Sequence, residues 1–191
     1  MHPAARFLDE RRDARLLLVN CDACGMAPEA TEASLEALSS GTATSATLIV
    51  PASNAFQAAS MARGYPIGIH LTLNSEWDSD RWYPLTHAPS LCEPDGSLNR
   101  QPAATCTHAK AAEVRAEFRA QIEQAISWGI DPTHLDSHMY LVQERPDFFD
   151  IYLDLAVEYD VPVRVSGAIT QPDHPFRLLA RERGVVCPDY L

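Results

Sequence analysis

The sequence predicts a single α/β domain, residues 1–191, built as an irregular or incomplete (β/α) barrel of parallel strands, similar to a TIM barrel. Short apolar runs alternate with longer segments of helical period, and the connections between them are mostly short. The length and the 46% hydrophobic content suffice for one core. An open doubly wound sheet is the competing architecture. No G-x-G-x-x-G or G-x-x-x-x-G-K-[ST] motif is present, so nucleotide binding has no support.

The first half of the chain predicts three strands and two helices. Residues 16–20 form an apolar run that ends in polar residues, as a strand would. Pro28 suits the first turn of a helix over residues 29–39, which Gly41 ends. The same alternation then gives a strand over 46–50, a helix over 54–63 and a strand over 67–73.

Residues 74–107 show no clean period and are predicted to be a long irregular loop. The segment is broken by prolines and by Asp95-Gly96, which favours a turn. A loop of this length in a compact domain is usually functional, so we expect a lid or a substrate wall here. At the other end of the chain, residues 1–14 are expected to form an N-terminal extension.

The second half continues the alternation. Residues 108–128 predict the longest helix because Val114, Phe118, Ile122 and Ile126 recur every four residues. The remaining segments predict a strand over 133–137, a helix over 146–159, a strand over 161–166, a helix over 176–183 and the start of a sixth strand at 185–187.

Charge and composition exclude several partners. The net charge of -11 and the pI of about 4.9 argue against nucleic acid or an anionic membrane, since phosphate binding needs a basic surface. No apolar run approaches the ~18 residues of a membrane span. The apolar run after the N-terminal arginines is too short for a signal peptide, so we expect a cytoplasmic protein. The five cysteines are dispersed and are expected to be free thiols.

Ionisable residues lie where parallel strands are predicted to end. In "IGIHLTL", His70 faces the side opposite the apolar residues, as a ligand or as a hydrogen-bonded core histidine. In "THLDSHM", His134, Asp136 and His138 share one face. Three such groups on a buried strand need pairing or a metal. The alternative is that Asp136 only orients a histidine.

The end of the first strand contains two candidate chemistries. Asp22 is a candidate base or ligand, or else a residue that caps the turn into the first helix. Cys21 and Cys24 have the C-x-x-C spacing of a redox pair or of half a zinc site. Four residues separate Cys24 from the predicted helix, which weakens the redox interpretation because the helix N-terminus no longer faces the thiols.

Five segments occur in a distinctive order: "LLLVNCDACGM", "GTATSATLIVP", "IGIHLTL", "PTHLDSHMY" and "GVVCPDYL". Over about residues 15–191 they resemble the blocks of the YdjC-like carbohydrate deacetylases, among them N-A-D-D-F-G-M, G-x-H-L-T-L and P-T-H-L-D-S-H-x-H. The resemblance implies an irregular β/α barrel. It also implies metal-dependent hydrolysis of an N-acetyl group on an amino sugar or oligosaccharide.

The resemblance also implies roles for individual residues. His70 and His138 fall on the two metal histidines of the family, and Asp22 on the first residue of its Asp pair, taken as the general base. The cofactor would be a divalent ion: zinc, magnesium, manganese or cobalt. Two histidines and a carboxylate suit magnesium less well than the other three.

The substrate would be a small carbohydrate, and three aromatic residues of the long loop are candidates to stack on it. An alternative role for these residues is to pin the loop to the body of the domain. A homo-oligomer is also expected, since an incomplete barrel leaves apolar wall to be covered. The three aromatic candidates are Trp77, Trp82 and Tyr83.

The sequence departs from the family pattern in three places. Ala23 replaces the second Asp, an expected metal ligand, and Tyr140 replaces a further histidine. The family also continues with a His-Pro-Gly segment, whereas this chain stops at Leu191, so the C-terminal part of the family fold is expected to be missing. Three interpretations follow: another group fills the vacancy at position 23, the chain is a catalytically impaired or non-catalytic member that binds a carbohydrate or a partner, or it is an active-site variant or truncated form of an active protein. Besides Cys21 and water, the candidates for an additional site residue are His134, Asp136 and Cys24.

Overall fold

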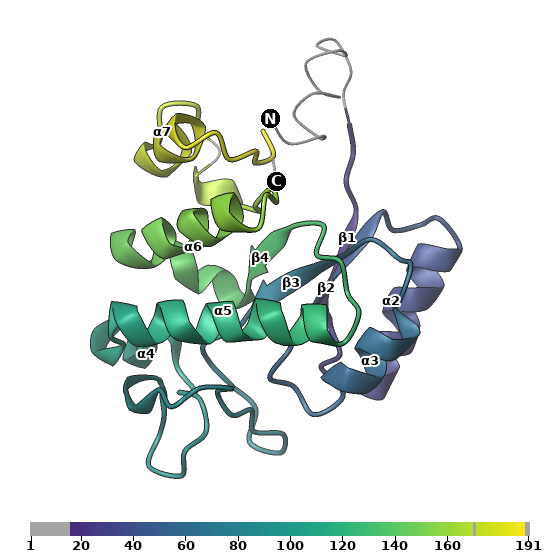
Figure 1. Cartoon of the computed structure of the whole chain (residues 1–191), viewed down its shortest axis with the longest axis horizontal. Helices are drawn as coiled ribbons and strands as arrows, with labels where there is room; N and C mark the ends of the chain where they lie inside the picture. Colours follow the sequence, from purple (N-terminus) through teal and green to yellow (C-terminus); the bar gives the residue numbers. More distant parts are fainter. Residues whose placement is uncertain (1–15, 170, 190–191) are drawn as a thin grey trace.

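A parallel sheet forms the centre of the protein. The computed structural model describes residues 16–169 and 171–189, so the expected extension at 1–14 lies outside the described residues. These residues form a four-stranded sheet in the order β1-β2-β3-β4 (Figure 1). The α/β class and the parallel strands are therefore confirmed. The strands are β1 (Asn20–Cys24), β2 (Ser45–Leu48), β3 (Ile67–Leu71) and β4 (Leu135–Ser137).

The strand order resembles one arc of a barrel wall. Each strand lies beside its neighbour in the chain, whereas a doubly wound sheet reverses its order at a switch point. Beyond β4, Leu135 forms an isolated parallel bridge with Val163, whose backbone N–H donates to the carbonyl of Val186 at 2.9 Å. The arc therefore continues past β4 through single contacts, and a closed barrel is not confirmed.

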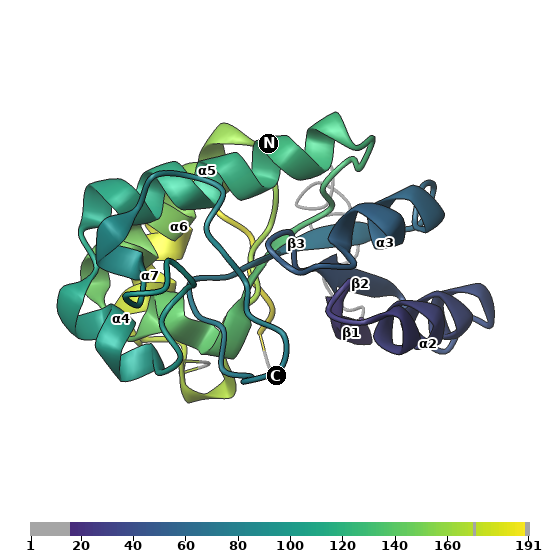
Figure 2. The same cartoon turned by 90° about the horizontal axis from the view of Figure 1, so that it is seen from below.

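Helices pack around the sheet in two groups. Figure 2 shows α2 and α3 beside β1 and β2, while α4 to α7 lie on the other side of the molecule. Four of the helices begin with proline, whose missing N–H costs nothing in a first turn. The helices are α2 (Pro28–Ser39), α3 (Ala55–Met61), α4 (Pro102–His108), α5 (Ala111–Ser127), α6 (Pro146–Glu158) and α7 (Pro175–Glu182), with 3-10 segments η1 (Pro89–Leu91), η2 (His138–Gln143) and η3 (Gly167–Ile169).

Three predicted strands differ from the structure. The first strand begins at Asn20 rather than at residue 16, and the apolar residues before it are exposed, Leu17 to 81%. The strand was predicted from the apolar character of residues 16–20, which does not show whether they pair with another strand. Residues 161–166 and 185–187 do not form strands, because their pairing is limited to the single contacts described above.

The long loop is an ordered wall that includes helical turns. The prediction of an irregular segment over 74–107 missed α4 and η1, since the prolines that start them were interpreted as loop residues. The guanidinium of Arg81 donates to Ser97 Oγ at 2.7 Å and to the carbonyl of Leu98 at 2.6 Å. Trp82 is 1% exposed and is thus part of the core.

The predicted core of the longest helix is mostly correct. Val114, Phe118 and Ile122 of α5 are fully buried, while Ile126 is 43% exposed because the helix ends one residue later, at Ser127. Within the described residues, none of the helices combines the length and apolar character required to cross a membrane.

Candidate active site

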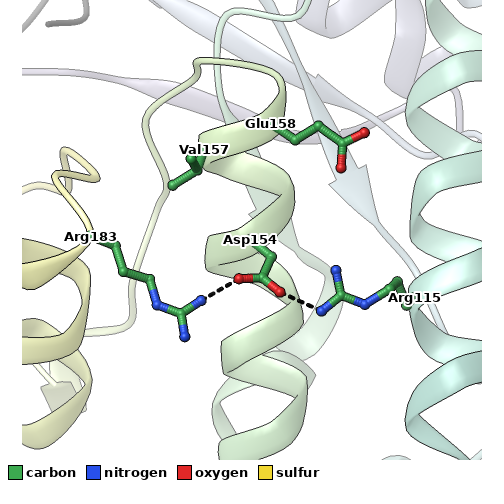
Figure 3. Close-up of a pocket in the computed structure, with 5 residues that line it drawn as sticks. All are labelled: Arg115, Asp154, Val157, Glu158 and Arg183. Carbon is green, nitrogen blue, oxygen red and sulfur yellow. Dashed lines mark hydrogen bonds and ion pairs between the residues drawn. The ribbon is translucent and has the colours of Figure 1, made fainter.

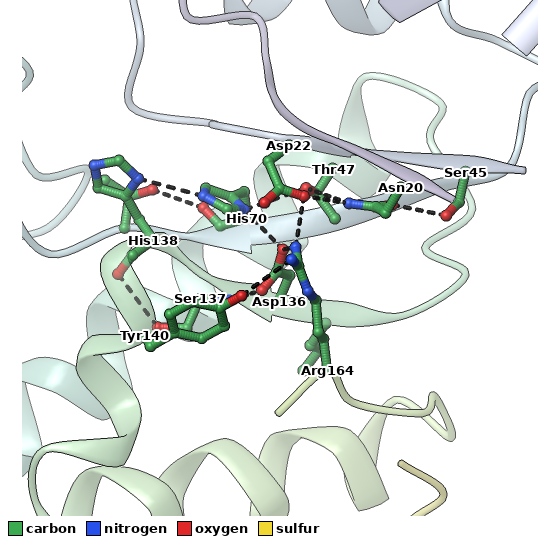
Figure 4. A network of polar contacts seen from close by, with 12 residues as sticks. Asn20, Asp22, Ser45, Thr47, His70, Asp136, Ser137, His138, Tyr140 and Arg164 are labelled. Carbon is green, nitrogen blue, oxygen red and sulfur yellow. Dashed lines mark hydrogen bonds and ion pairs between the residues drawn. The ribbon is translucent and has the colours of Figure 1, made fainter. Parts of the chain in front are cut away.

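The register of β3 and β4 brings His70 and Asp136 together. These residues are paired across the two parallel strands, so their side chains leave the sheet on the same face. His70 Nδ1 lies 3.1 Å from Asp136 Oδ2, and both residues are buried. Thr47 on β2 contributes its Oγ1 at 3.2 Å from the same nitrogen. Figure 4 shows this group at the carboxyl edge of the sheet.

The contact with Asp136 fixes where His70 carries its proton. Burial alone would raise the pKa of Asp136, but the hydrogen bond and charge of His70, together with the charge of Arg164, lower it below its ordinary value. The ionised carboxylate only accepts hydrogen bonds. His70 therefore donates from Nδ1, and its Nε2 has a free lone pair when the ring is neutral.

His138 has a carboxylate partner too, but at its other ring nitrogen, Nε2. It begins η2 directly after β4, and its Nε2 lies 3.0 and 3.2 Å from the two carboxylate oxygens of Glu76. Burial would raise the pKa of Glu76, but the hydrogen bond and charge of His138 lower it. His138 therefore donates from Nε2, and when the ring is neutral its lone pair is on Nδ1, which lies 3.3 Å from His70 Nε2.

Two unprotonated nitrogens that face each other at this distance suit a cation. Two nitrogens at about 2.0–2.1 Å from a tetrahedral zinc ion would be about 3.3–3.4 Å apart. The distance between His70 Nε2 and His138 Nδ1 therefore fits two ligands of one ion. Among residues 16–169 and 171–189, no group of three or more His, Cys, Asp or Glu side chains is arranged to hold a metal. The pair thus fits a divalent ion as two ligands, with no third protein ligand among these residues.

The backbone at Ala23 has a conformation that alanine rarely adopts. Ala23 has φ 62°, in the left-handed region, and lies where the pairing of β1 with β2 shifts register. Asp and Asn occupy this region several times more often than other non-glycine residues. The two residues after His138, Met139 and Tyr140, are also left-handed, with φ 52° and 54°. Backbone strain is therefore concentrated beside the site residues.

Arg164 joins the exposed and the buried carboxylates of the site. Its Nη1 donates to Asp22 Oδ1 at 2.5 Å and to Asp136 Oδ2 at 2.9 Å, and its Nη2 donates to the hydroxyl of Tyr140 at 3.0 Å (Figure 4). Burial would lower the pKa of Arg164, but the hydrogen bond to Asp22 and the charge of Asp136 raise it, so the guanidinium stays charged. Asn20 Nδ2 donates to Asp22 Oδ1 at 2.7 Å. Asp22 is thus fixed by two donors while remaining open to solvent.

Sequence reasoning missed Arg164 and Glu76. A charged residue within the apolar run "VPVRV" was a signal for Arg164, since a charge on a predicted strand must find partners. Glu76 carried a weaker signal, because nothing in the sequence of the long loop indicates that it reaches His138.

Other candidates lie apart from the histidine pair. The ring of His134 covers Gly68, where a Cβ would be 2.5 Å from it, and burial lowers the pKa of His134. Cys24 is fully buried, and burial raises the pKa of its thiol. All five cysteines are free thiols.

The three aromatic candidates of the loop differ in exposure. Trp82 is buried and packs edge-on against the ring of His138, with centroids 5.6 Å apart, so the prediction that it could stack on a sugar is wrong. Trp77 and Tyr83 are 54% and 53% exposed, and both stay candidates.

A surface hollow between α5, α6 and α7 is unrelated to this site. Asp154 forms ion pairs with Arg115 on one side and Arg183 on the other (Figure 3). The cationic groups there are already paired with carboxylates of the same chain, so the hollow is stabilised by its own charges.

The fold and the site define an α/β protein with two facing histidines, each backed by a carboxylate, at the carboxyl edge of a parallel sheet. Residues 16–187 match the family of YdjC-like proteins, and the chain belongs to that family. It is 35% identical over 153 residues to a carbohydrate deacetylase of Geobacillus stearothermophilus, which covers 78% of this chain and 59% of the relative. It is 39% identical over 118 residues to a carbohydrate deacetylase of Thermus thermophilus, covering 60% of this chain and 44% of the relative. The chain therefore spans about half the length of these relatives.

A solved structure supports the same fold. The crystal structure of an Enterococcus faecalis protein, associated by name with cellobiose-phosphate cleavage, superposes with a TM-score of 0.78 at 27% identity. The match covers 90% of this chain and 66% of that protein.

Proposed function

We propose that this chain is a metal-dependent carbohydrate deacetylase that hydrolyses the N-acetyl group of an amino sugar or oligosaccharide. The observation that carries the proposal is the facing pair of ring nitrogens, His70 Nε2 and His138 Nδ1, 3.3 Å apart, with a carboxylate at the other nitrogen of each ring. The similarity to carbohydrate deacetylases supports the substrate class.

His70 and His138 would hold the ion, and their nitrogen donors favour zinc, manganese or cobalt over magnesium. When bound, a divalent ion lowers the pKa of a water molecule and polarises a carbonyl oxygen. The proton transfers need residues of the chain itself, and we assign them to Asp22, which Asn20 and Arg164 contact.

Asp22 is proposed as the general base. It is open to solvent, and Asn20 and Arg164 fix its Oδ1, which leaves Oδ2, without a hydrogen bond to the described residues, to take a proton. The water oxygen attacks the acetyl carbon while Asp22 accepts the water proton. The C–N bond then breaks, and the proton passes to the amine, which leaves acetate and the free amino sugar.

A second candidate is a family member that binds a carbohydrate without turnover. Ala23 favours it, because alanine cannot replace the carboxylate that the family resemblance places there and the described residues supply no third ligand. Both candidates use the same site and differ in whether the histidine pair alone retains the ion.

Acetate release separates the two candidates. The protein is incubated with N-acetylglucosamine oligomers and added zinc, manganese or cobalt, and acetate is measured enzymatically. We expect metal-stimulated release that His138→Ala and Asp22→Asn abolish, while Asp131→Asn, at an exposed position, leaves it unchanged. Background release with every metal, together with no bound ion by elemental analysis, would refute the deacetylase proposal for this chain.

A further inference from the structure

Glu76 reaches the site from the long loop. It lies six residues beyond His70 in the chain, outside β3, and its side chain is 27% exposed. Both carboxylate oxygens lie within hydrogen-bond distance of a single nitrogen, Nε2 of His138. The carboxylate therefore connects the long loop to the ring of His138.

The ring of His138 is held on several sides. Glu76 accepts a hydrogen bond from its Nε2, Trp82 packs edge-on against it at 5.6 Å, and His70 packs edge-on at 5.3 Å between centroids. Without the carboxylate, the ring would keep its packing neighbours but would lose the contact that decides which nitrogen carries the proton. If the proton moved to Nδ1, the lone pair would point away from His70.

The lone pairs on the two nitrogens of an imidazole ring point in divergent directions. Glu76 lies at Nε2, whereas His70 lies at Nδ1. Glu76 in this position therefore acts on an ion between the histidines only through the ring of His138. Asp136 has the same relation to His70, at its Nδ1.

Resting on the proposed function, we propose that Glu76 is the positioning residue of His138. Its carboxylate keeps the Nδ1 lone pair directed at His70 and makes that nitrogen a stronger donor. Carboxylates behind ligand histidines fix the tautomer and raise the basicity of the ring, and their loss typically costs about 10–100-fold in metal affinity. Glu76 and Asp136 together offset part of what the alanine at position 23 removes.

The test is a Co²⁺ titration of the full chain, followed by absorption and by calorimetry. Glu76→Ala is expected to weaken Co²⁺ binding by about 10–100-fold. Glu76→Gln keeps an acceptor oxygen but loses the charge, so it should weaken binding less. The matched control is Glu93→Gln, which changes a carboxylate of the same loop whose partners among the described residues are the backbone N–H of Arg100 and the guanidinium groups of Arg81 and Arg100. Its affinity should equal that of the unchanged protein.

A second measurement decides the proposal without a metal. In the metal-free protein, Nε2–H of His138 should give a hydrogen-bonded imidazole proton resonance that disappears in His138→Ala and in Glu76→Ala but persists in Glu93→Gln. A resonance that is unaffected by Glu76→Ala overturns the proposal, as does unchanged Co²⁺ affinity in that variant.

The two proposals fail in different ways. If the unchanged protein binds Co²⁺ and His70→Ala abolishes binding, while Glu76→Ala binds normally, only the role of Glu76 is refuted. If the unchanged protein binds no Co²⁺, the proposed function fails, and the imidazole resonance still decides whether Glu76 positions His138. Thermal unfolding and circular dichroism of each variant show whether the loop has remained folded.

Discussion

Replacing Ala23 by aspartate should add a third ligand to the metal site proposed for His70 and His138. The chain has a left-handed φ of 62° at this position, beside the proposed base Asp22. Alanine is strained in this conformation, and aspartate adopts it more readily because its short polar side chain hydrogen-bonds locally. The substitution therefore changes two things, the backbone strain and the ligand set, and each needs its own measurement.

Ala23→Gly separates the two effects, because glycine relieves the strain without adding a carboxylate. A left-handed alanine costs roughly 1–2 kcal/mol. We expect Ala23→Gly to raise the free energy of unfolding of the metal-free protein by about 1 kcal/mol, and Ala23→Asp to raise it by less. Only Ala23→Asp should strengthen metal binding, by more than the ~10–100-fold that carboxylates behind the ligands contribute.

The assays are urea unfolding without metal and Co²⁺ or Zn²⁺ calorimetry, with acetate release as the functional readout. A gain in metal affinity and activity in Ala23→Asp alone would identify position 23 as a vacated ligand. Equal metal affinity in the alanine, glycine and aspartate proteins would refute a ligand role for position 23. A loss of stability in Ala23→Gly would refute the backbone strain at Ala23.

Three further substitutions test the surroundings of the site. Tyr152→Phe removes hydrogen bonds of 2.7 and 3.0 Å to the carbonyls of Leu135 and Arg164, so urea unfolding should show a loss of about 1–3 kcal/mol. Burial raises the pKa of Tyr152 well above its ordinary value, so its stabilising contribution is complete below about pH 10 and is lost as the pH rises further. Unfolding at pH 9 and pH 11 should show a smaller pH-dependent loss in Tyr152→Phe than in the unchanged protein; an equal loss would contradict this assignment. Gly68→Ala places a methyl group 2.5 Å from the ring of His134 and should cost about 1–3 kcal/mol, which a second change, His134→Ala, should largely restore. Trp77→Ala should raise KM for an N-acetylated oligosaccharide about 2- to 10-fold with little change in kcat, and Tyr83→Ala tests the same role for the other exposed ring; an unchanged KM in both variants would contradict a stacking role for these residues.

The inner strands of the sheet were predictable because short apolar or alternating segments bounded by turn residues give a local signal. The predicted strands at 46–50, 67–73 and 133–137 overlap β2, β3 and β4. The strands predicted at residues 16–20, 161–166 and 185–187 were not found as predicted. An apolar run such as residues 16–20 looks like a strand, but the pairing that defines a strand depends on partners elsewhere in the chain.

In the site, too, local patterns predicted the strand residues but not the residues that reach the site from distant parts of the chain. Strand period placed His70 and Asp136 on the face opposite the apolar residues, and the register of β3 with β4 brings them together. Period also placed His134 on this face, and its ring does pack there, over Gly68 rather than against the histidine pair. Arg164 and Glu76 reach the site through contacts 142 and 62 residues apart in the chain, which no local pattern encodes.

The most direct test of the proposed metal site is an anomalous diffraction map of crystals soaked in Co²⁺ or Zn²⁺. One peak is expected about 2.0–2.1 Å from both Nε2 of His70 and Nδ1 of His138, the distance usual between zinc and histidine. No peak between these two nitrogens at a metal concentration that loads the protein in solution, or a peak bound elsewhere, would contradict it.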